Sequence, residues 1–158
     1  MLRSCSKASR MEADVFKKIA VAYNESAEAQ RALASAIQLA KSLDAELETI
    51  TVMANLPSYT AFAGAADPSL PQVLKTDRAR FYEELQERAR ITALGHGLQL
   101  ESHAIEGSAV DAIVKHLRAR KSDLLVVGLH PRDLYIARLW STVYGLAQEA
   151  PCSVLGVH

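Results

Sequence analysis

The chain has 158 residues, 49% of them hydrophobic, and its 18 Lys and Arg residues balance its 18 Asp and Glu residues. This size and composition predict one domain with a full apolar core. The lack of a basic excess argues against a dedicated nucleic-acid surface or anionic-membrane surface, and the longest apolar runs are too short to span a bilayer.

Residues 1–13 are predicted to form a flexible tail ahead of a single domain at 14–158. The first ten residues are basic and polar and lack the apolar segment of a secretory signal, and Met11 is an alternative start. Of the two cysteines, Cys5 lies in this tail and Cys152 just before the last strand. A disulfide framework is therefore not expected, and a reducing cytoplasm fits this pattern.

The first half of the domain alternates strand and helix signals. Residues 18–23 form a continuous apolar run, which predicts a buried strand. Ser26 is predicted to cap a helix whose apolar residues recur at helical spacing up to Leu43. Residues 47–53, rich in Ile, Thr and Val, are predicted as the second strand. Residues 54–70 form the longest irregular stretch, and we expect this loop to be mobile.

The second half continues the alternation. A charged helix is predicted over 71–94, with Leu74, Phe81 and Leu85 on its apolar side. Further strands are predicted at 98–105, 123–127 and 153–157, and further helices after Gly107-Ser108 and at 142–149. The helix after Ser108 is expected to turn inward Ala109, Ala112, Ile113, His116 and Leu117. Alternating strands and helices imply right-handed βαβ units and a parallel sheet.

The last third of the chain has the layout of an anion site. Residues 122–128 predict a strand that ends in glycine, and a helix is predicted to begin at Ser141-Thr142. This arrangement can place a phosphate-sized anion against backbone N–H groups at the carboxyl end of a parallel strand. However, Pro131 and Ser141 stand where such a loop favours glycine.

Three segments resemble motifs of the universal stress protein family, and the resemblance spans 17–158. They are VAYNES at 21–26, EGSA at 106–109 and APCSVLGV at 150–157. The resemblance implies a five-stranded parallel sheet of order 3-2-1-4-5 with helices on both faces, an adenine nucleotide alpha-hydrolase-like fold. A ligand cleft is then expected between the first and fourth strands.

Members of that family with the nucleotide motif hold ATP or AMP in this cleft. Their motif is a glycine, two residues, a second glycine, nine residues, a third glycine, then Ser or Thr. Counted from Gly128, this chain keeps the spacing, but Pro131 and Ser141 replace the second and third glycines. Thr142 supplies the hydroxyl. Val52 matches the position at which the family contacts adenine through its backbone.

Four departures from the family pattern weigh against its way of binding phosphate. Pro131 has no N–H to donate, and Ser141 tolerates a positive φ poorly. Asn24 stands in place of the strand-one aspartate and keeps an acceptor without the charge. Glu25 stands in place of the following glycine and adds a negative charge near the expected phosphates.

Other residues favour a ligand site. Thr142 is expected at a helix N-terminus, and His130, Arg132 and Arg138 are placed to replace lost donors with charge-assisted bonds. The alternative is that the arginines are solvated and Ser141-Thr142 only caps a helix. The candidate cleft residues are Ala22, Asn24, Val52, Gly128, His130, Arg132, Ser141 and Thr142.

The sequence predicts neither catalytic residues nor a metal site. No Ser-His-Asp, Cys-His or paired-carboxylate arrangement is visible in sequence order. The five histidines show no ligand spacing with a cysteine or a carboxylate. Efficient catalysis is therefore not expected.

The leading hypothesis is a cytoplasmic, homodimeric regulatory protein whose degenerate cleft holds ATP or AMP weakly or not at all. The alternatives are a genuine ATP- or AMP-binding stress protein with at most slow ATPase activity, and a binder of another small anionic metabolite. The family resemblance implies a homodimer through the last strand, Ser153–Val157, whose exposed edge invites pairing. No nucleic-acid or membrane partner is expected.

Overall fold

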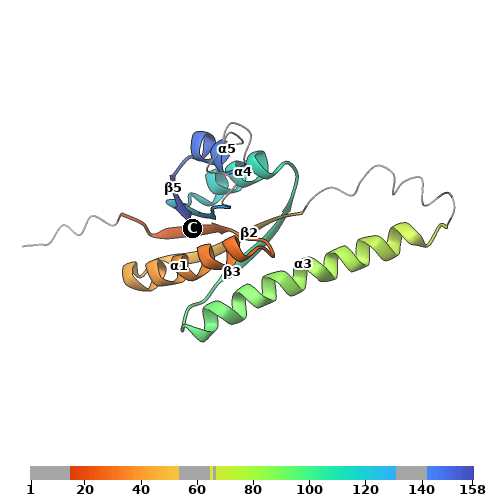
Figure 1. Ribbon diagram of the computed structural model, residues 1–158, viewed down its shortest axis with the longest axis horizontal. Helices are drawn as coiled ribbons and strands as arrows, with labels where there is room; N and C mark the ends of the chain where they lie inside the picture. The colour runs from red at the N-terminus through yellow and green to blue at the C-terminus, as the bar shows by residue number, and fades with distance from the viewer. Residues whose placement is uncertain (1–14, 54–64, 66, 131–141) are drawn as a thin grey trace, which may run out of the picture.

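The computed structural model describes residues 15–53, 65, 67–130 and 142–158. Five parallel strands form one sheet in the order β3-β2-β1-β4-β5, which confirms the predicted fold class (Figure 1). The strands are β1 (Lys18–Ala22), β2 (Glu46–Met53), β3 (Glu101–Glu106), β4 (Leu124–Gly128) and β5 (Ser153–Val157). The helices are α1 (Ala27–Leu43), α3 (Leu70–Gly95), α4 (Ala109–Arg120) and α5 (Thr142–Glu149).

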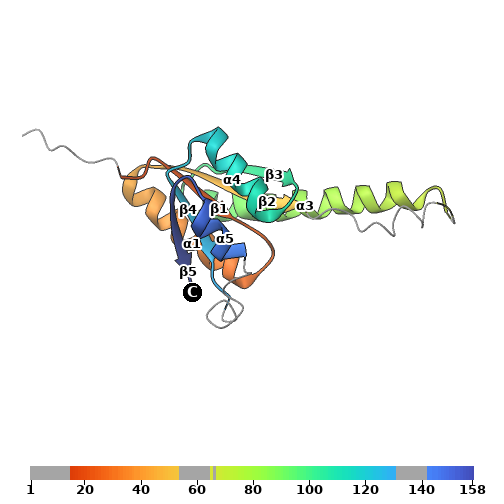
Figure 2. The same ribbon diagram turned by 90° about the horizontal axis from the view of Figure 1, so that it is seen from above.

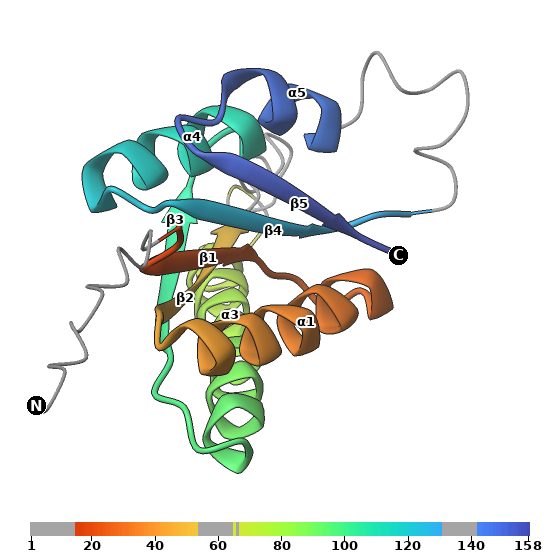
Figure 3. The ribbon, with the colours of Figure 1, turned by 90° about the vertical axis from the view of Figure 1, so that its left-hand side faces the viewer.

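Helices cover both faces of the sheet, as Figure 3 shows, with α1 and α3 on one side and α4 and α5 on the other. Each side has its own apolar cluster. The α1 side is built around Ile19, Val21, Leu33, Ile37, Leu85 and Val126, and the α4 side around Ala20, Ile50, Ile113, Leu117, Leu125 and Leu146. The two clusters bury both faces of the central strands, as expected for a parallel sheet.

Asp123 fixes the position of β1 relative to β4. Its Oδ2 accepts hydrogen bonds from the backbone N–H groups of Lys17 (2.8 Å) and Lys18 (2.9 Å). In the resulting register Ile19 pairs with Leu124. The carboxyl ends of these two strands therefore lie next to each other.

The helix α1 begins and packs as predicted. Ser26 is its N-cap, and the Ser26 Oγ accepts a hydrogen bond from the N–H of Ala29 at 3.1 Å. The helix buries small side chains against the sheet, namely Ala29, Ala32, Ala36 and Ala40. Because these side chains are small, the helix backbone can approach the strands closely.

The prediction for α3 is right about the helix and wrong about its apolar side. Of the three residues expected to pack, Leu85 is buried, Leu74 is half-buried and Phe81 is 43% exposed. Figure 1 and Figure 2 show the reason, since the first half of this 26-residue helix runs out beyond the sheet. Only its second half meets the strands, through Leu85, Ala89 and Ala93.

Other boundaries differ from the predictions by a few residues at most. β3 begins at Glu101, three residues later than predicted, and it is an edge strand as expected. Among the helices that the structure describes, none is both long enough and apolar enough to cross a membrane. The predicted tail at 1–13 and most of the loop at 54–70 lie outside the described residues.

Candidate functional site

A cleft lies at the carboxyl ends of β1 and β4, with a volume of about 270 Å³. The chain leaves β1 toward one edge of the sheet and later returns through β4 toward the other. Doubly wound sheets bind ligands at such a point. The described lining consists of Ala22, Tyr23, Asn24, Ser26, Ala29, Ile50, Val52, Ala109, Ile113, Val127, Gly128, Thr142, Val143 and Leu146.

The walls of the cleft are mainly apolar. Ile50 and Val52 come from one face of β2, since alternate residues of a strand share a face. Ile113 comes from α4, and Val143 and Leu146 come from α5. Apolar walls with a few polar groups are typical of a site for a small organic ligand.

Five of the eight candidate residues line this cleft: Ala22, Asn24, Val52, Gly128 and Thr142. His130 is exposed and does not belong to the described lining. Arg132 and Ser141 lie outside the described residues, as do Pro131 and Arg138. Whether any of the eight candidate residues contacts a ligand stays a prediction.

Several cleft residues are not among the eight candidates, namely Tyr23, Ile50, Ala109, Ile113, Val143 and Leu146. Two signals were available for some of them. Ile50 lies two residues before Val52 and therefore on the same face of β2. Ile113 was expected to face inward, but helical spacing alone does not say that it lies beside the ligand.

Asn24 organises the start of α1. Its Oδ1 accepts hydrogen bonds from the Ser26 N–H at 3.0 Å and the Ser26 Oγ at 2.6 Å. This is an Asx-type turn directly before the helix. The side-chain oxygen is thus engaged within the chain, which leaves the NH₂ group as the other hydrogen-bonding group of the Asn24 side chain.

Gly128 is required by packing, whether or not a phosphate binds. A Cβ added there would lie 2.4 Å from the carbonyl carbon and 2.5 Å from the carbonyl oxygen of Glu28. Only glycine lets the end of β4 approach the first turn of α1 this closely. The presence of glycine at this position is therefore weak evidence for phosphate binding.

Thr142 is the first residue of α5 and is exposed beside the cleft. The first N–H groups of a helix have no partner within the helix and attract anions. Because α5 packs against α4, this helix lies on the α4 side of the sheet. Like the N-terminus of α1, whose cap Ser26 also lines the cleft, the start of α5 is a feature of the described lining that favours phosphate.

The described lining offers no general base. It contains no carboxylate, histidine, cysteine, lysine or arginine side chain. Burial raises the pKa of Tyr23, and the charge of Arg88 offsets only part of that effect, so the phenol stays protonated at neutral pH. Chemically, this part of the cleft can bind a ligand, but it cannot take a proton from one.

A sequence model of the "Universal stress protein family" matches residues 16–158. A solved universal stress protein in complex with cAMP is similar to this chain, with 25% identity and a TM-score of 0.71, covering 91% of this chain and 98% of the other. The universal stress protein UspA from Lactobacillus plantarum is 22% identical, with a TM-score of 0.70, covering 90% and 98%.

A family protein from Arabidopsis thaliana with AMP bound is 17% identical, with a TM-score of 0.64, covering 89% of this chain and 90% of the other. At this identity the likeness supports the fold alone. The family match, by contrast, covers nearly all of the chain and agrees with the strand order and the place of the cleft. The chain therefore belongs to the universal stress protein family.

Proposed function

We propose that this chain is a regulatory protein of the universal stress type whose cleft holds an adenine nucleotide weakly or not at all. Its signal would pass through surfaces of the protein, not through turnover of a substrate. The observation that carries the proposal is the described lining of the cleft, which joins apolar walls to hydroxyl and amide groups and contains no cationic side chain.

The two halves of a nucleotide would meet unequal surroundings. The base is offered apolar walls from Ile50, Ile113 and Leu146, and burying it there is favourable. The phosphates would meet the start of α5 and the Thr142 hydroxyl. The exposed Glu25, which follows Asn24 in the sequence, adds a negative charge that disfavours them. Desolvated phosphate charge needs compensating donors, so we expect low affinity.

A genuine ATP- or AMP-binding protein, with at most slow ATPase activity, is the second candidate. Two observations favour it. Similar solved structures contain cAMP or AMP, and Thr142 keeps a hydroxyl at the helix N-terminus beside the cleft. Another small anionic metabolite that binds in the same cleft is the third candidate.

We further propose a cytoplasmic homodimer that pairs through β5. This strand lies at one edge of the sheet and pairs only with β4 among the described strands. Leu155, in its centre, is 37% exposed. An unpaired edge with an exposed apolar side chain suits pairing with a second copy of the chain.

The nucleotide proposal is tested by calorimetric titration of the full chain with ATP, AMP and cAMP, with and without Mg²⁺. We expect weak or undetectable binding. Where weak binding is seen, Thr142→Val should reduce it, because the variant keeps the shape and loses the hydroxyl. Thr92→Val is the matched control, since Thr92 lies on α3, donates to the Arg88 carbonyl and does not line the cleft.

Tight binding that Thr142→Val abolishes would support the second candidate. Stabilisation by a non-nucleotide anion alone would support the third. A ligand at 100 times its Kd stabilises a protein by roughly 2.7 kcal/mol, which a thermal scan detects.

A further inference from the structure

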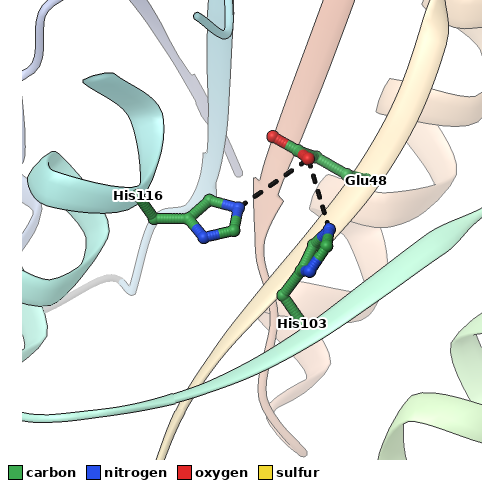
Figure 4. Close-up of side chains that lie close together, drawn as sticks. All are labelled: Glu48, His103 and His116. Atoms are coloured by element: carbon green, nitrogen blue, oxygen red, sulfur yellow. Dashed lines mark ion pairs between the residues drawn. The ribbon is translucent and has the colours of Figure 1, made fainter. Parts of the chain in front are cut away.

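A second polar site lies on the α4 side of the sheet. The carboxylate of Glu48 on β2 and the imidazoles of His103 on β3 and His116 on α4 point toward one another (Figure 4). The Glu48 Oε2 lies 3.4 Å from the His103 Nε2 and 3.7 Å from the His116 Nε2. All three atoms lie within 4.8 Å of one another, so three typical metal-binding atoms share one small volume.

The sheet register brings these side chains together. Glu48 pairs with Glu101, and Ile50 pairs with His103. Because side chains alternate along a strand, these four side chains share one face of the sheet, the face that α4 covers. None of the three clustered residues lines the cleft at the carboxyl ends of the strands, so the two sites are separate.

Both histidine Nε2 atoms are buried and lie at ion-pair distance from the Glu48 carboxylate, but neither makes a hydrogen bond of good geometry with the described residues. The Glu48 side chain beside them is only 1% exposed. Buried polar atoms normally have partners, and those without one call for an explanation. A single cation held by all three side chains would satisfy both imidazole nitrogens and the carboxylate.

The geometry is close to that of a metal site. Tetrahedral ligands at bond lengths of roughly 2.0–2.1 Å lie about 3.3 Å apart, near the separations of Glu48 from His103 and His116. The Ser122 Oγ donates to the Glu48 Oε1 at 2.7 Å and leaves Oε2 to face the histidines. Such outer support orients metal-binding carboxylates. Glu48 also lines a hollow together with Lys18 and Glu101.

Two cationic side chains compete for the same carboxylate. The Arg120 Nε lies 3.2 Å from the Glu48 Oε2, and the Lys18 Nζ lies 3.9 Å from it. Arg120 also pairs with Glu101 through Nη2. The Arg120 side chain is 35% exposed, so its guanidinium group can turn into solvent when a cation takes its place beside Glu48.

We propose that Glu48, His103 and His116 bind a divalent transition-metal cation such as Zn²⁺, and that Arg120 neutralises Glu48 in the metal-free protein. Imidazole and carboxylate together suit this class of metal. Water completes the coordination, or Glu101, whose Oε2 lies 3.4 Å from the His103 Nε2. This site is independent of the nucleotide cleft and of the function proposed for it.

The test is a calorimetric titration of the chelator-stripped full chain with Zn²⁺. We expect one equivalent of Zn²⁺ to bind. His103→Gln and His116→Gln should each weaken binding by at least about tenfold, because losing even an outer partner of a metal ligand costs about 10- to 100-fold in affinity. His96→Gln is the control, since His96 is an exposed histidine at the end of α3. Arg120→Gln should tighten binding, because it removes the competing charge, an outcome that a purely structural cluster does not predict.

A second measurement does not depend on how the variants fold. Long-range ¹H–¹⁵N spectra of the wild-type imidazoles should show the Nε2 signals of His103 and His116 moving as Zn²⁺ is added, while those of His96 stay in place. The proposal is overturned if no Zn²⁺ binds, if binding is unchanged in both glutamine variants, or if the signals of His103 and His116 do not move.

Discussion

Gly128 at the end of β4 lies directly against the backbone of Glu28 in the first turn of α1, and a Cβ there would be 2.4 Å from the Glu28 carbonyl carbon. Gly128 therefore both lines the cleft and sets how closely α1 packs on the sheet. The residue at which the family's nucleotide motif begins is also the residue that lets α1 and β4 meet.

Gly128→Ala should therefore destabilise the protein whether or not a nucleotide binds. The added methyl group meets backbone atoms, which cannot move as a flexible side chain can, and we expect a loss of about 1–3 kcal/mol. Urea unfolding without ligand measures this loss. Gly95→Ala, at the end of α3 with no atom near its would-be Cβ, should leave the stability unchanged or slightly raised. Equal midpoints for the two variants would contradict the packing explanation.

Ser26→Ala should also destabilise the protein, because Ser26 caps the end of α1 that borders the cleft. The variant removes the cap that the Ala29 N–H donates to and the hydroxyl that donates to Asn24, at a cost of about 1 kcal/mol. Denaturant midpoints measure the change. The control is Ser42→Ala, an exposed serine near the end of the same helix whose hydroxyl donates to the Gln38 carbonyl, for which we expect less than ~0.5 kcal/mol. If Ser42→Ala costs as much as Ser26→Ala, the capping role is wrong.

The dimer proposal predicts that Leu155→Lys separates the subunits, since a charge in the centre of an edge strand opposes pairing. Light scattering after size exclusion should give a dimer for the wild type and a monomer for the variant at micromolar concentrations. Leu43→Lys, an equally exposed leucine at the end of α1, should remain a dimer. A monomeric wild type would remove the proposal.

Cys152 should react slowly with Ellman's reagent in the native protein. Burial raises the pKa of its thiol, and the charge of Asp123 raises it further, so less of the reactive thiolate is present at neutral pH. The rate should rise with pH, with a midpoint above that of an ordinary thiol. The comparison is with the urea-unfolded chain, in a Cys5→Ser background so that one thiol reports. A native rate equal to the unfolded rate would contradict this account.

The order of strands and helices could be predicted from the sequence because buried parallel strands are short apolar runs and α1 has a clear helical period. The same reasoning failed for the first half of α3. There Phe81 fits an apolar stripe, but whether a stripe is buried depends on how far the sheet extends, and helical spacing carries no information about that.

The cluster of Glu48, His103 and His116 could not be predicted from spacing. Its members come from two strands and a helix, and only the β2–β3 register, with Ile50 beside His103, places them on one face. The place of the cleft could be predicted because the family resemblance implied the strand order, and the switch point follows from that order. The apolar walls that α4 and α5 contribute to the cleft could not be predicted, because they depend on how these two helices pack.

We expect the cleft to hold an adenine nucleotide weakly or not at all. Mass spectrometry of what freshly purified protein releases when it is heat-denatured measures the occupancy. We predict less than stoichiometric ATP, ADP or AMP, together with little thermal stabilisation on adding ATP and Mg²⁺. One equivalent of nucleotide per chain would contradict the claim and would show that the altered loop still holds phosphate.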